Sequence, residues 1–332
     1  MPGRPRLVHV DTERGWRGGQ VQLEAFLHAT RDAFEHHLVV PLRSPWEERL
    51  PPGVELHRLP LWGRRMGRRD LRDRLHSLAP HAIGVHTAHA LALVEGPWPQ
   101  VVHRRVDFVP SRWALRRLRR AARVLAVSRA VAELLRTRGV ERVRVVHDGV
   151  DHDVPVAAAP SRPRLLAVGA LVPHKDHATL LRAMVHVPVP LDIAGEGPLR
   201  PRLQRRIRRL GLEERVRLLG SVDDVPFRLT EASALVHPSK EEGLGQVVLE
   251  AMARGVPVVA SRAGGLPEAV GADGLMVPVR DPAALAAALN HVLSEGGRFR
   301  KHLASVHPAR ARRFGLDGMV SATASAYWEA AG

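Results

Sequence analysis

The feature that most constrains the fold of this 332-residue chain is a strand-loop-helix-strand pattern between residues 234 and 260. An apolar run from Ala234 to Val236 leads into a short loop, and helical spacing follows from Gly245 to Arg254. Gly255 stands where a left-handed residue commonly ends a helix, and valines resume at 256, 258 and 259. This order predicts a parallel-sheet unit, with its loop at the end of a strand.

The loop of this unit carries residues that suit a phosphate group and sugar hydroxyls. Glu242 lies in the loop, and Glu250 follows eight residues later on the same helical face as Gln246. At the start of a helix, backbone amides and the helix dipole favour an anion. The helix opens with Gly243, Leu244, Gly245 and Gln246. Amides for phosphate beside carboxylates for hydroxyls suit a nucleotide-sugar.

The same residues resemble a known signature. Two glutamates eight apart, followed by Ala-Met-Ala-x-Gly-x-Pro-Val-Val-Ala, are similar to the donor site of glycosyltransferase family 4. The resemblance implies an α/β protein of the GT-B fold, in which two Rossmann-like parallel-sheet domains face a central cleft. It also implies a retaining hexosyl or related transferase that needs no cofactor and no catalytic metal. On this resemblance Glu242 contacts the transferred sugar as a catalytic residue, and Glu250 contacts the ribose of the donor.

Short apolar runs alternate with helical stretches along most of the chain, which favours parallel sheets covered on both faces. A proline- and alanine-rich segment at 153–163 predicts a linker. We therefore expect an N-terminal acceptor-side domain at 1–153 and a donor domain at 154–310. The resemblance implies that a final helical segment, 311–332, packs back on the N-terminal domain.

A second loop of the expected donor domain also follows a strand. Residues 168–175 resemble the family's strand-end motif, which normally carries an arginine and a lysine for the diphosphate. Gly169 opens this loop and Lys175 matches the lysine, but Ala170 stands where the arginine is expected. We expect the amides of the Gly243 loop, Lys240 or His174 to compensate for the missing charge.

In the N-terminal half, Gly18 and Gly19 follow the first expected strand and resemble the family's phosphate and acceptor loop. His103 follows another strand and is similar in position to an active-site histidine of some family members, so we take it as a second catalytic candidate. His86 and His89 are further histidine candidates. No third ligand is evident beside these two, so the sequence predicts no metal there.

The net charge of +16 comes almost wholly from arginine, since only three of the 50 basic residues are lysines. Two stripes of arginine at helical spacing are expected, namely Arg65, Arg68, Arg69 and Arg72, and Arg112, Arg116, Arg119, Arg120 and Arg123. They predict either peripheral contact with an anionic membrane or an ordinary solvated face. Aromatic residues are only 4% of the chain and no RNA-binding or helix-turn-helix signature is present, which disfavours nucleic acid as a partner.

The chain shows no apolar run of 18 residues, no signal-like N-terminal segment and no cysteine. We therefore expect a cytoplasmic protein, with peripheral attachment to the inner membrane face as an option. The expected partners are a nucleotide-sugar donor and an acceptor glycan or glycolipid. The donor's base and sugar and the acceptor, for which a lipid-linked or envelope glycan is one candidate, stay open. Three rival interpretations also stay open, namely a sugar-nucleotide epimerase, a non-catalytic sugar-nucleotide binder and a basic nucleic-acid-binding protein.

Overall fold

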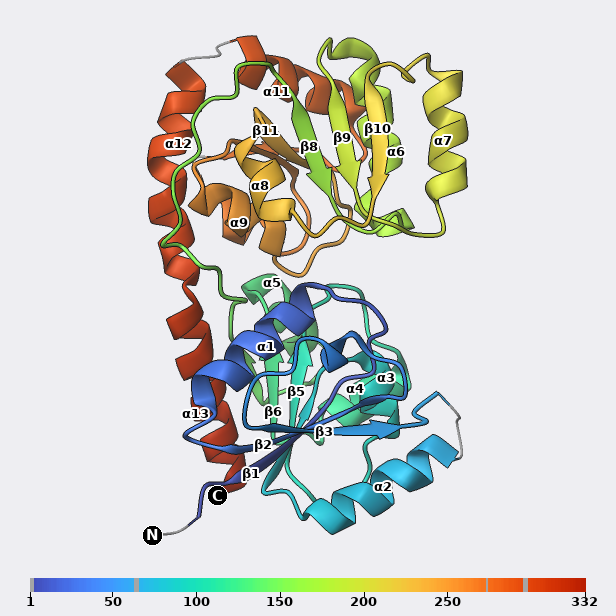
Figure 1. Cartoon of the computed structure of the whole chain (residues 1–332), viewed down its shortest axis with the longest axis vertical. Helices are drawn as coiled ribbons and strands as arrows, with labels where there is room; N and C mark the ends of the chain where they lie inside the picture. The colour runs from blue at the N-terminus through green and yellow to red at the C-terminus, as the bar shows by residue number, and fades with distance from the viewer. Residues whose placement is uncertain (1–2, 63–65, 273, 295–297) are drawn as a thin grey trace. The chain divides into compact units, whose positions relative to one another are not determined.

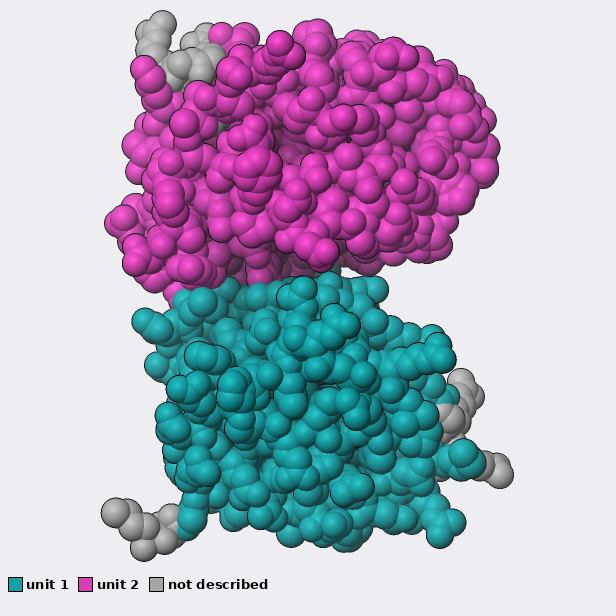
Figure 2. All heavy atoms as spheres, viewed as in Figure 1, with its two compact units in different colours: residues 1–149, 316–332 teal, residues 150–315 magenta. Residues whose placement is uncertain are grey.

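The computed structural model describes residues 3–62, 66–272, 274–294 and 298–332. The chain divides into two compact units, which Figure 2 shows in different colours. Unit 1 contains Met1–Gly149 and Leu316–Gly332, and unit 2 contains Val150–Gly315. The proline-rich segment 153–163 thus lies within unit 2, because Val150 already donates to Phe314 at 2.7 Å and Ala157 donates to Arg254 at 2.8 Å.

Unit 1 is built on a sheet whose described strands run in the order β3-β2-β1-β4-β5-β6-β7, every pair being parallel (Figure 1). These strands were marked in the sequence by apolar runs without alternation, because both faces are covered; all four residues of β4 are buried. The strands are β1 (Arg6–Val10), β2 (Glu35–Pro41), β3 (Val54–Leu59), β4 (Ala82–Val85), β5 (Gln100–Arg104), β6 (Arg123–Ala126) and β7 (Val143–Val145).

The helices of unit 1 connect these parallel strands, as crossover geometry requires. They are α1 (Gly18–Thr30), α2 (Met66–Leu78), α3 (Ala88–Leu93), α4 (Arg112–Leu118), α5 (Arg129–Arg136) and α13 (Leu316–Ala331), with a short 3₁₀ turn η1 (Pro45–Glu47). Each of α3, α4 and α5 begins after a serine or threonine whose hydroxyl accepts from a backbone amide of the first turn.

Unit 2 repeats the architecture with the strand order β10-β9-β8-β11-β12-β13, again parallel throughout. Its strands are β8 (Leu165–Val168), β9 (Leu191–Ala194), β10 (Val216–Gly220), β11 (Ala234–His237), β12 (Val258–Ser261) and β13 (Leu275–Val277). Its helices are α6 (His177–Ala183), α7 (Arg200–Arg209), α8 (Val225–Thr230), α9 (Gln246–Ala253), α10 (Leu266–Val270), α11 (Pro282–Ser294) and α12 (Arg298–Ala311). Three 3₁₀ turns complete it, namely η2 (Pro173–Lys175), η3 (Met184–His186) and η4 (Arg312–Phe314). The prediction of two Rossmann-like parallel-sheet domains is confirmed.

The last helix belongs to the first unit. α13 contacts α1 and strands of the sheet of unit 1, and in Figure 1 its red ribbon lies beside the blue one of α1. Its Tyr327 is fully buried and stacks on Phe26 of α1 with ring centroids 5.4 Å apart. Gly84 in β4 makes room for this contact, because a β-carbon there would overlap the Tyr327 hydroxyl and lie 2.6 Å from His9 Nδ1.

The arginine stripe expected from 112 to 123 is only partly helical. α4 ends at Leu118, so Arg112 and Arg116 share its surface, whereas Arg123 opens β6. Arg123 pairs with Glu329 of α13 at 2.8 Å and is therefore not part of a free basic face. The apolar run after Arg123 pairs with β5 and β7, and this pairing ends the helical pattern.

The other expected stripe, at 65–72, is partly paired with acidic neighbours. Arg68 lies 3.4 Å from Glu95, and both Arg69 and Arg72 lie within 4 Å of Asp73. Arg65 lies outside the described residues. Among the helices described, none combines the length and apolarity needed to cross a bilayer.

The packing of α13 predicts opposite effects for two glycine-to-alanine changes. Gly84→Ala should destabilise unit 1 by about 1–3 kcal/mol, because its methyl group overpacks the Tyr327 contact. Gly318→Ala is the control in α13 itself: its β-carbon would meet nothing within 4 Å, so it should be neutral or stabilise by up to ~1 kcal/mol. Urea unfolding followed by tryptophan fluorescence measures both, since all six tryptophans lie in unit 1. Equal stabilities of the two variants would contradict this account of the helix contact.

Candidate functional site

The predicted donor loops lie at the point where the strand order of unit 2 reverses. β8 and β11 are neighbours there, although β9 and β10 lie between them in sequence order. The loop at 169–175 follows β8, and the loop at 238–245 follows β11. In open parallel sheets ligands bind outside the carboxyl ends of strands at this reversal. The topology therefore brings the two predicted loops to the position where a ligand is expected.

Lys175 and Glu242 meet directly across these two loops. The Lys175 Nζ atom lies 2.5 Å from Glu242 Oε2, and His237 Nε2 lies 2.6 Å from the same oxygen. Ser239 Oγ donates to it as well, at 3.3 Å. The lysine and glutamate side chains are only 19% and 14% exposed, so the pair is largely shielded from solvent. The site is a charged cluster built on the ends of two adjacent strands.

Burial alone would raise the pKa of Glu242, but the Lys175 ammonium and the hydrogen bond from His237 outweigh it. Together they hold the pKa of this carboxyl well below its usual range. Burial lowers the pKa of His237, so at neutral pH its imidazole is neutral and donates from Nε2 to the carboxylate. Glu242 is therefore an ionised, fixed acceptor at neutral pH.

The segment after Glu242 presents backbone donors. In the described part of the chain, the amides of Gly243, Leu244, Gly245 and Gln246 donate to no backbone or side-chain acceptor. Gly245 has a φ of +95°, and a β-carbon there would lie 2.7 Å from Leu266 Cδ2, so only glycine fits this turn. The turn and the first residues of α9 thus present unpaired amides that can bind an anion.

Gln246 and Glu250 share one face of α9, as predicted. Gln246 Nε2 donates to Glu250 Oε1 at 3.0 Å, while the buried Gln246 Oε1 has no partner among the described residues. Burial raises the pKa of Glu250, against the opposing effects of the Gln246 hydrogen bond and Arg254. The unpaired Gln246 Oε1 can accept a hydrogen bond from a ligand hydroxyl, because an amide oxygen is an acceptor.

The β8 loop lacks the expected arginine, because Ala170 stands in its place. A β-carbon on Gly169 would lie 3.5 Å from Lys175 Cδ, so this glycine covers the lysine stem. The Ala170 carbonyl accepts from His177 Nε2 at 3.3 Å, and burial lowers the pKa of His177 to about 4, which makes it neutral. Lys240 joins the loop through its backbone amide, which donates to His174 O at 2.7 Å.

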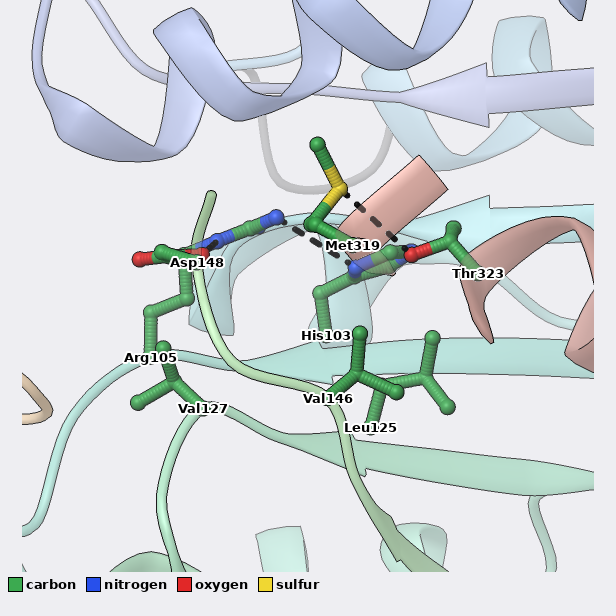
Figure 3. A pocket seen from close by; sticks show the side chains of 8 residues that line it. All are labelled: His103, Arg105, Leu125, Val127, Val146, Asp148, Met319 and Thr323. Carbon is green, nitrogen blue, oxygen red and sulfur yellow. Dashed lines mark hydrogen bonds and ion pairs between the residues drawn. The ribbon is translucent and has the colours of Figure 1, made fainter. Parts of the chain in front are cut away.

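The candidates of the N-terminal half gather in unit 1, also at the carboxyl ends of strands. A β-carbon on Gly19, in the first turn of α1 after Gly18, would lie 3.6 Å from Arg105 Cδ. Arg105 in turn donates from Nε to Asp148 at 2.9 Å and approaches His103 Nδ1 with Nη2 at 3.5 Å. Figure 3 shows His103, Arg105 and Asp148 lining one small pocket with Met319 and Thr323 of α13.

The ring of His103 is held by a buried chain of hydrogen bonds. Its Nε2 atom lies 3.0 Å from the Tyr327 hydroxyl, which lies 3.4 Å from His9 Nδ1. His86 Nε2 contacts the same His9 nitrogen at 3.1 Å, and the rings of His86 and His103 stack with centroids 4.3 Å apart. Burial lowers the pKa of His9, His86 and His103 well below the usual value, so these rings are neutral at neutral pH.

The hydrogen bonds of Thr30 and His36, at the other end of this network, assign the histidine tautomers there. Thr30 Oγ1 donates to the Phe26 carbonyl at 2.6 Å, so it accepts from His36 Nε2, and His36 Nδ1 then accepts from His9 Nε2 at 3.1 Å. His9 Nδ1 is consequently an acceptor, within reach of both His86 Nε2 and the Tyr327 hydroxyl. Arg105 can only donate, so its contact with His103 Nδ1 assigns the His103 proton to Nε2, which faces the Tyr327 hydroxyl. The Nδ1 lone pair of His103 is therefore directed to Arg105.

His89 does not join this cluster. Its Nε2 atom contacts the Leu61 carbonyl at 3.1 Å, and its ring stacks on Trp62 with centroids 4.4 Å apart. Four residues that sequence reasoning missed hold the predicted ones in place: His237 and Ser239 for Glu242, and Arg105 and Tyr327 for His103. His237 and Ser239 could have been noticed as polar residues directly before the Glu242 loop, whereas the place of Tyr327 depends on the docking of α13.

Two sequence families match most of this chain. The family described as Glycosyltransferase Family 4 matches residues 16–154, and the one described as Glycosyl transferases group 1 matches residues 162–295. The chain is 33% identical to the D-inositol 3-phosphate glycosyltransferase of Streptomyces bingchenggensis over 74% of its own length. It spans 61% of that protein, which is less than two thirds of its length.

A second relative is covered more fully. The chain is 31% identical to the 2-deoxystreptamine N-acetyl-D-glucosaminyltransferase of Streptomyces fradiae, over 83% of this chain and 70% of that one. Its fold is similar to the crystal structure of Anabaena HepE in complex with UDP-glucose, with a TM-score of 0.83, 21% identity and coverage of 97% and 99% of the two chains. The two Rossmann-like sheets and the similarity to HepE identify the GT-B fold. Together with the sequence matches on both halves, they show that the chain belongs to glycosyltransferase family 4.

Proposed function

We propose that this chain transfers a sugar from a nucleoside-diphosphate sugar to an acceptor hydroxyl with retention of the anomeric configuration. The observation that carries the proposal is the Lys175–Glu242 pair beside the unpaired amides of 243–246, at the strand reversal of unit 2. A cation and amides stabilise a diphosphate, while an ionised carboxylate accepts from sugar hydroxyls. The complex of HepE with UDP-glucose supports the same class of donor.

The donor's parts are assigned by the groups that suit them. Lys175 and the amides of Gly243–Gln246 bind the diphosphate, and Gly169 keeps the lysine stem covered. Glu242 accepts from hydroxyls of the transferred sugar, and Gln246 with Glu250 accepts from the ribose. Because Ala170 replaces the expected arginine, the backbone amides have to stabilise more of the negative charge of the diphosphate. No cofactor or metal is part of this proposal.

In the reaction the bond between the anomeric carbon and the β-phosphate oxygen breaks, and a bond to the acceptor oxygen forms on the same face. The departing phosphate takes the acceptor's proton, so atoms and charge balance without an enzymic nucleophile. Glu242 does not attack, because its Oε2 already accepts from Lys175, His237 and Ser239. His103, whose Nδ1 is kept as an acceptor, orients a hydroxyl, and Gly18 and Gly19 let the α1 loop approach the substrates.

The epimerase and the non-catalytic binder are weaker alternatives. The two relatives described above are named as glycosyltransferases, which favours transfer. Product analysis separates the three: a transferase forms a glycoside with an added acceptor, an epimerase releases an isomer without one, and a binder does neither. The names of both relatives contain a cyclitol, so inositol phosphate and 2-deoxystreptamine belong on the acceptor panel beside lipid-linked glycans.

A membrane-borne acceptor is supported by the surface around α4. Phe108, Val109 and Trp113 are 46%, 58% and 47% exposed, and the exposed Arg112 and Arg116 lie on the same short segment. Exposed aromatic and apolar residues beside exposed arginines suit the interface of an anionic bilayer. We name Phe108, Val109, Arg112, Trp113 and Arg116 the α4 surface, and we propose peripheral contact through it.

The donor assignment predicts a large loss of activity on removal of Lys175. Lys175→Ala should lower kcat/KM for the nucleotide-sugar by about 10²–10³, because one preorganised positive group at the leaving phosphate is lost. Glu242→Gln should lower it as well, whereas Lys301→Ala, a change at an exposed lysine of α12, should not. Release of nucleoside diphosphate in the presence of an acceptor panel is the measurement. Unchanged turnover in both site variants would refute the donor site.

The low pKa of Glu242 predicts a specific dependence of stability on pH. The folded-state pKa lies below the unfolded value of about 4.3, so the pair's contribution is fully present above pH ~4.3 and is lost as the pH falls through the folded pKa. The difference in unfolding free energy between wild type and Glu242→Gln should therefore be constant from pH 5.5 to 8 and should shrink below pH ~4.3. Hydrogen exchange of the β8 and β11 amides at several pH values measures this difference in unfolding free energy. A difference that grows on acidification would show that Glu242 is not ionised in the folded state.

The α4 surface predicts selective binding to anionic vesicles. Phosphatidylglycerol vesicles should sediment the wild-type protein more than phosphatidylcholine vesicles do, and Arg112→Glu with Arg116→Glu should abolish the difference. Arg202→Glu with Arg205→Glu on α7 makes the same change of net charge on exposed residues of unit 2. If that control loses binding equally, net charge rather than the α4 surface is responsible, and the proposed contact is wrong.

A further inference from the structure

Two histidines and a glutamate meet on one face of the sheet of unit 1, in the edge strand β3 and its neighbour β2. The parallel register pairs His37 with Glu55 and Val39 with His57. Since side chains alternate along a strand, Glu55 and His57 project to the same face, which is also the face of His37. These residues lie in the middle of their strands rather than at the carboxyl ends, so they are separate from the loops described above.

The three side chains are arranged as ligands of one ion. His37 Nδ1 lies 3.0 Å from His57 Nε2, and the Glu55 carboxylate lies 3.4 Å from the first nitrogen and 3.5 Å from the second. One ligand atom from each residue falls within 4.8 Å of the others. Tetrahedral bonds of 2.0–2.1 Å to a zinc ion place two ligands about 3.3 Å apart, so the present spacing needs little adjustment.

The hydrogen bonds around His37 fix the tautomer that a metal-binding histidine needs. Its Nε2 atom donates to Glu35 Oε1 at 3.0 Å, and Arg6 holds that carboxylate at 2.8 Å. The proton therefore resides on Nε2, which leaves the Nδ1 lone pair facing His57. A carboxylate behind a ligating imidazole is the usual second layer of a metal site. Both histidines are buried while Glu55 is exposed, which gives an ion access from solvent.

We propose that His37, Glu55 and His57 bind one divalent transition-metal ion, Zn²⁺ being the best match, with water as the fourth ligand. Two imidazoles and a carboxylate favour this class of ion over Mg²⁺ or Ca²⁺, which prefer oxygen ligands. Without an ion, His57 Nε2–H donates to His37 Nδ1. On binding, the His57 proton moves to Nδ1 and both ring lone pairs go to the metal.

Titration of the full chain with the metal alone, after treatment with a chelator, tests the site. Calorimetry should show one tight Zn²⁺ site, and Co²⁺ in its place should give the intense visible bands of tetrahedral coordination. Glu55→Gln, a change at an exposed side chain, should weaken Zn²⁺ binding by at least about 10-fold and remove these bands. His57→Gln should do the same, with circular dichroism confirming that both variants fold.

His28→Gln removes an exposed histidine of α1 and is the matched control. It should retain the tight site and the Co²⁺ spectrum. The proposal is overturned if the control weakens Zn²⁺ binding equally, if Glu55→Gln leaves the Zn²⁺ affinity unchanged, or if Co²⁺ gives only octahedral bands. Each of these results would mean that the metal binds only to surface histidines. The outcome is independent of sugar transfer, since no step of the proposed reaction involves these residues.

Discussion

Strands that pair in parallel cannot be joined by a tight turn, so each connection must cross back along a face of the sheet. That constraint covers both faces with helices and brings the loops that follow the strands to one edge. In unit 2 it brings Lys175, after β8, to Glu242, after β11, although 67 residues separate them. In unit 1 it brings the first turn of α1 to Arg105, which in turn approaches His103. The chemistry of both units follows from where parallel strands end.

Buried polar groups in this protein are held by further polar groups, and their protonation follows from the partners. Glu242 stays ionised because a lysine and two donors surround one oxygen, while the histidines around Tyr327 stay neutral because burial penalises their charged forms. Leaving any one member unpaired is costly in such a site. The positions of the side chains that could act on a substrate are therefore properties of whole networks.

Much of this architecture could be predicted from the sequence because its signals are local. The apolar runs, the glycine turn before α9 and the spacing of Glu242, Gln246 and Glu250 all lie within short segments. What could not be predicted depends on pairing between distant segments. The arginine stripe expected at 112–123 extends beyond α4, because Arg123 belongs to β6, which pairs with β5 and β7. The contact of Tyr327 with His103 spans 224 residues, and the His37–Glu55 pairing depends on strand register.

The place of α13 has a consequence for how the chain is made. The ribosome synthesises the strands of unit 1 first, but Tyr327, which fills their core beside Phe26 and Gly84, emerges only after the whole of unit 2. Unit 2 is contiguous, so it can fold during translation, whereas unit 1 must wait with an unfilled core until α13 has left the exit tunnel. Nascent chains stalled before α13 should accordingly depend on chaperones for their first half rather than for their second.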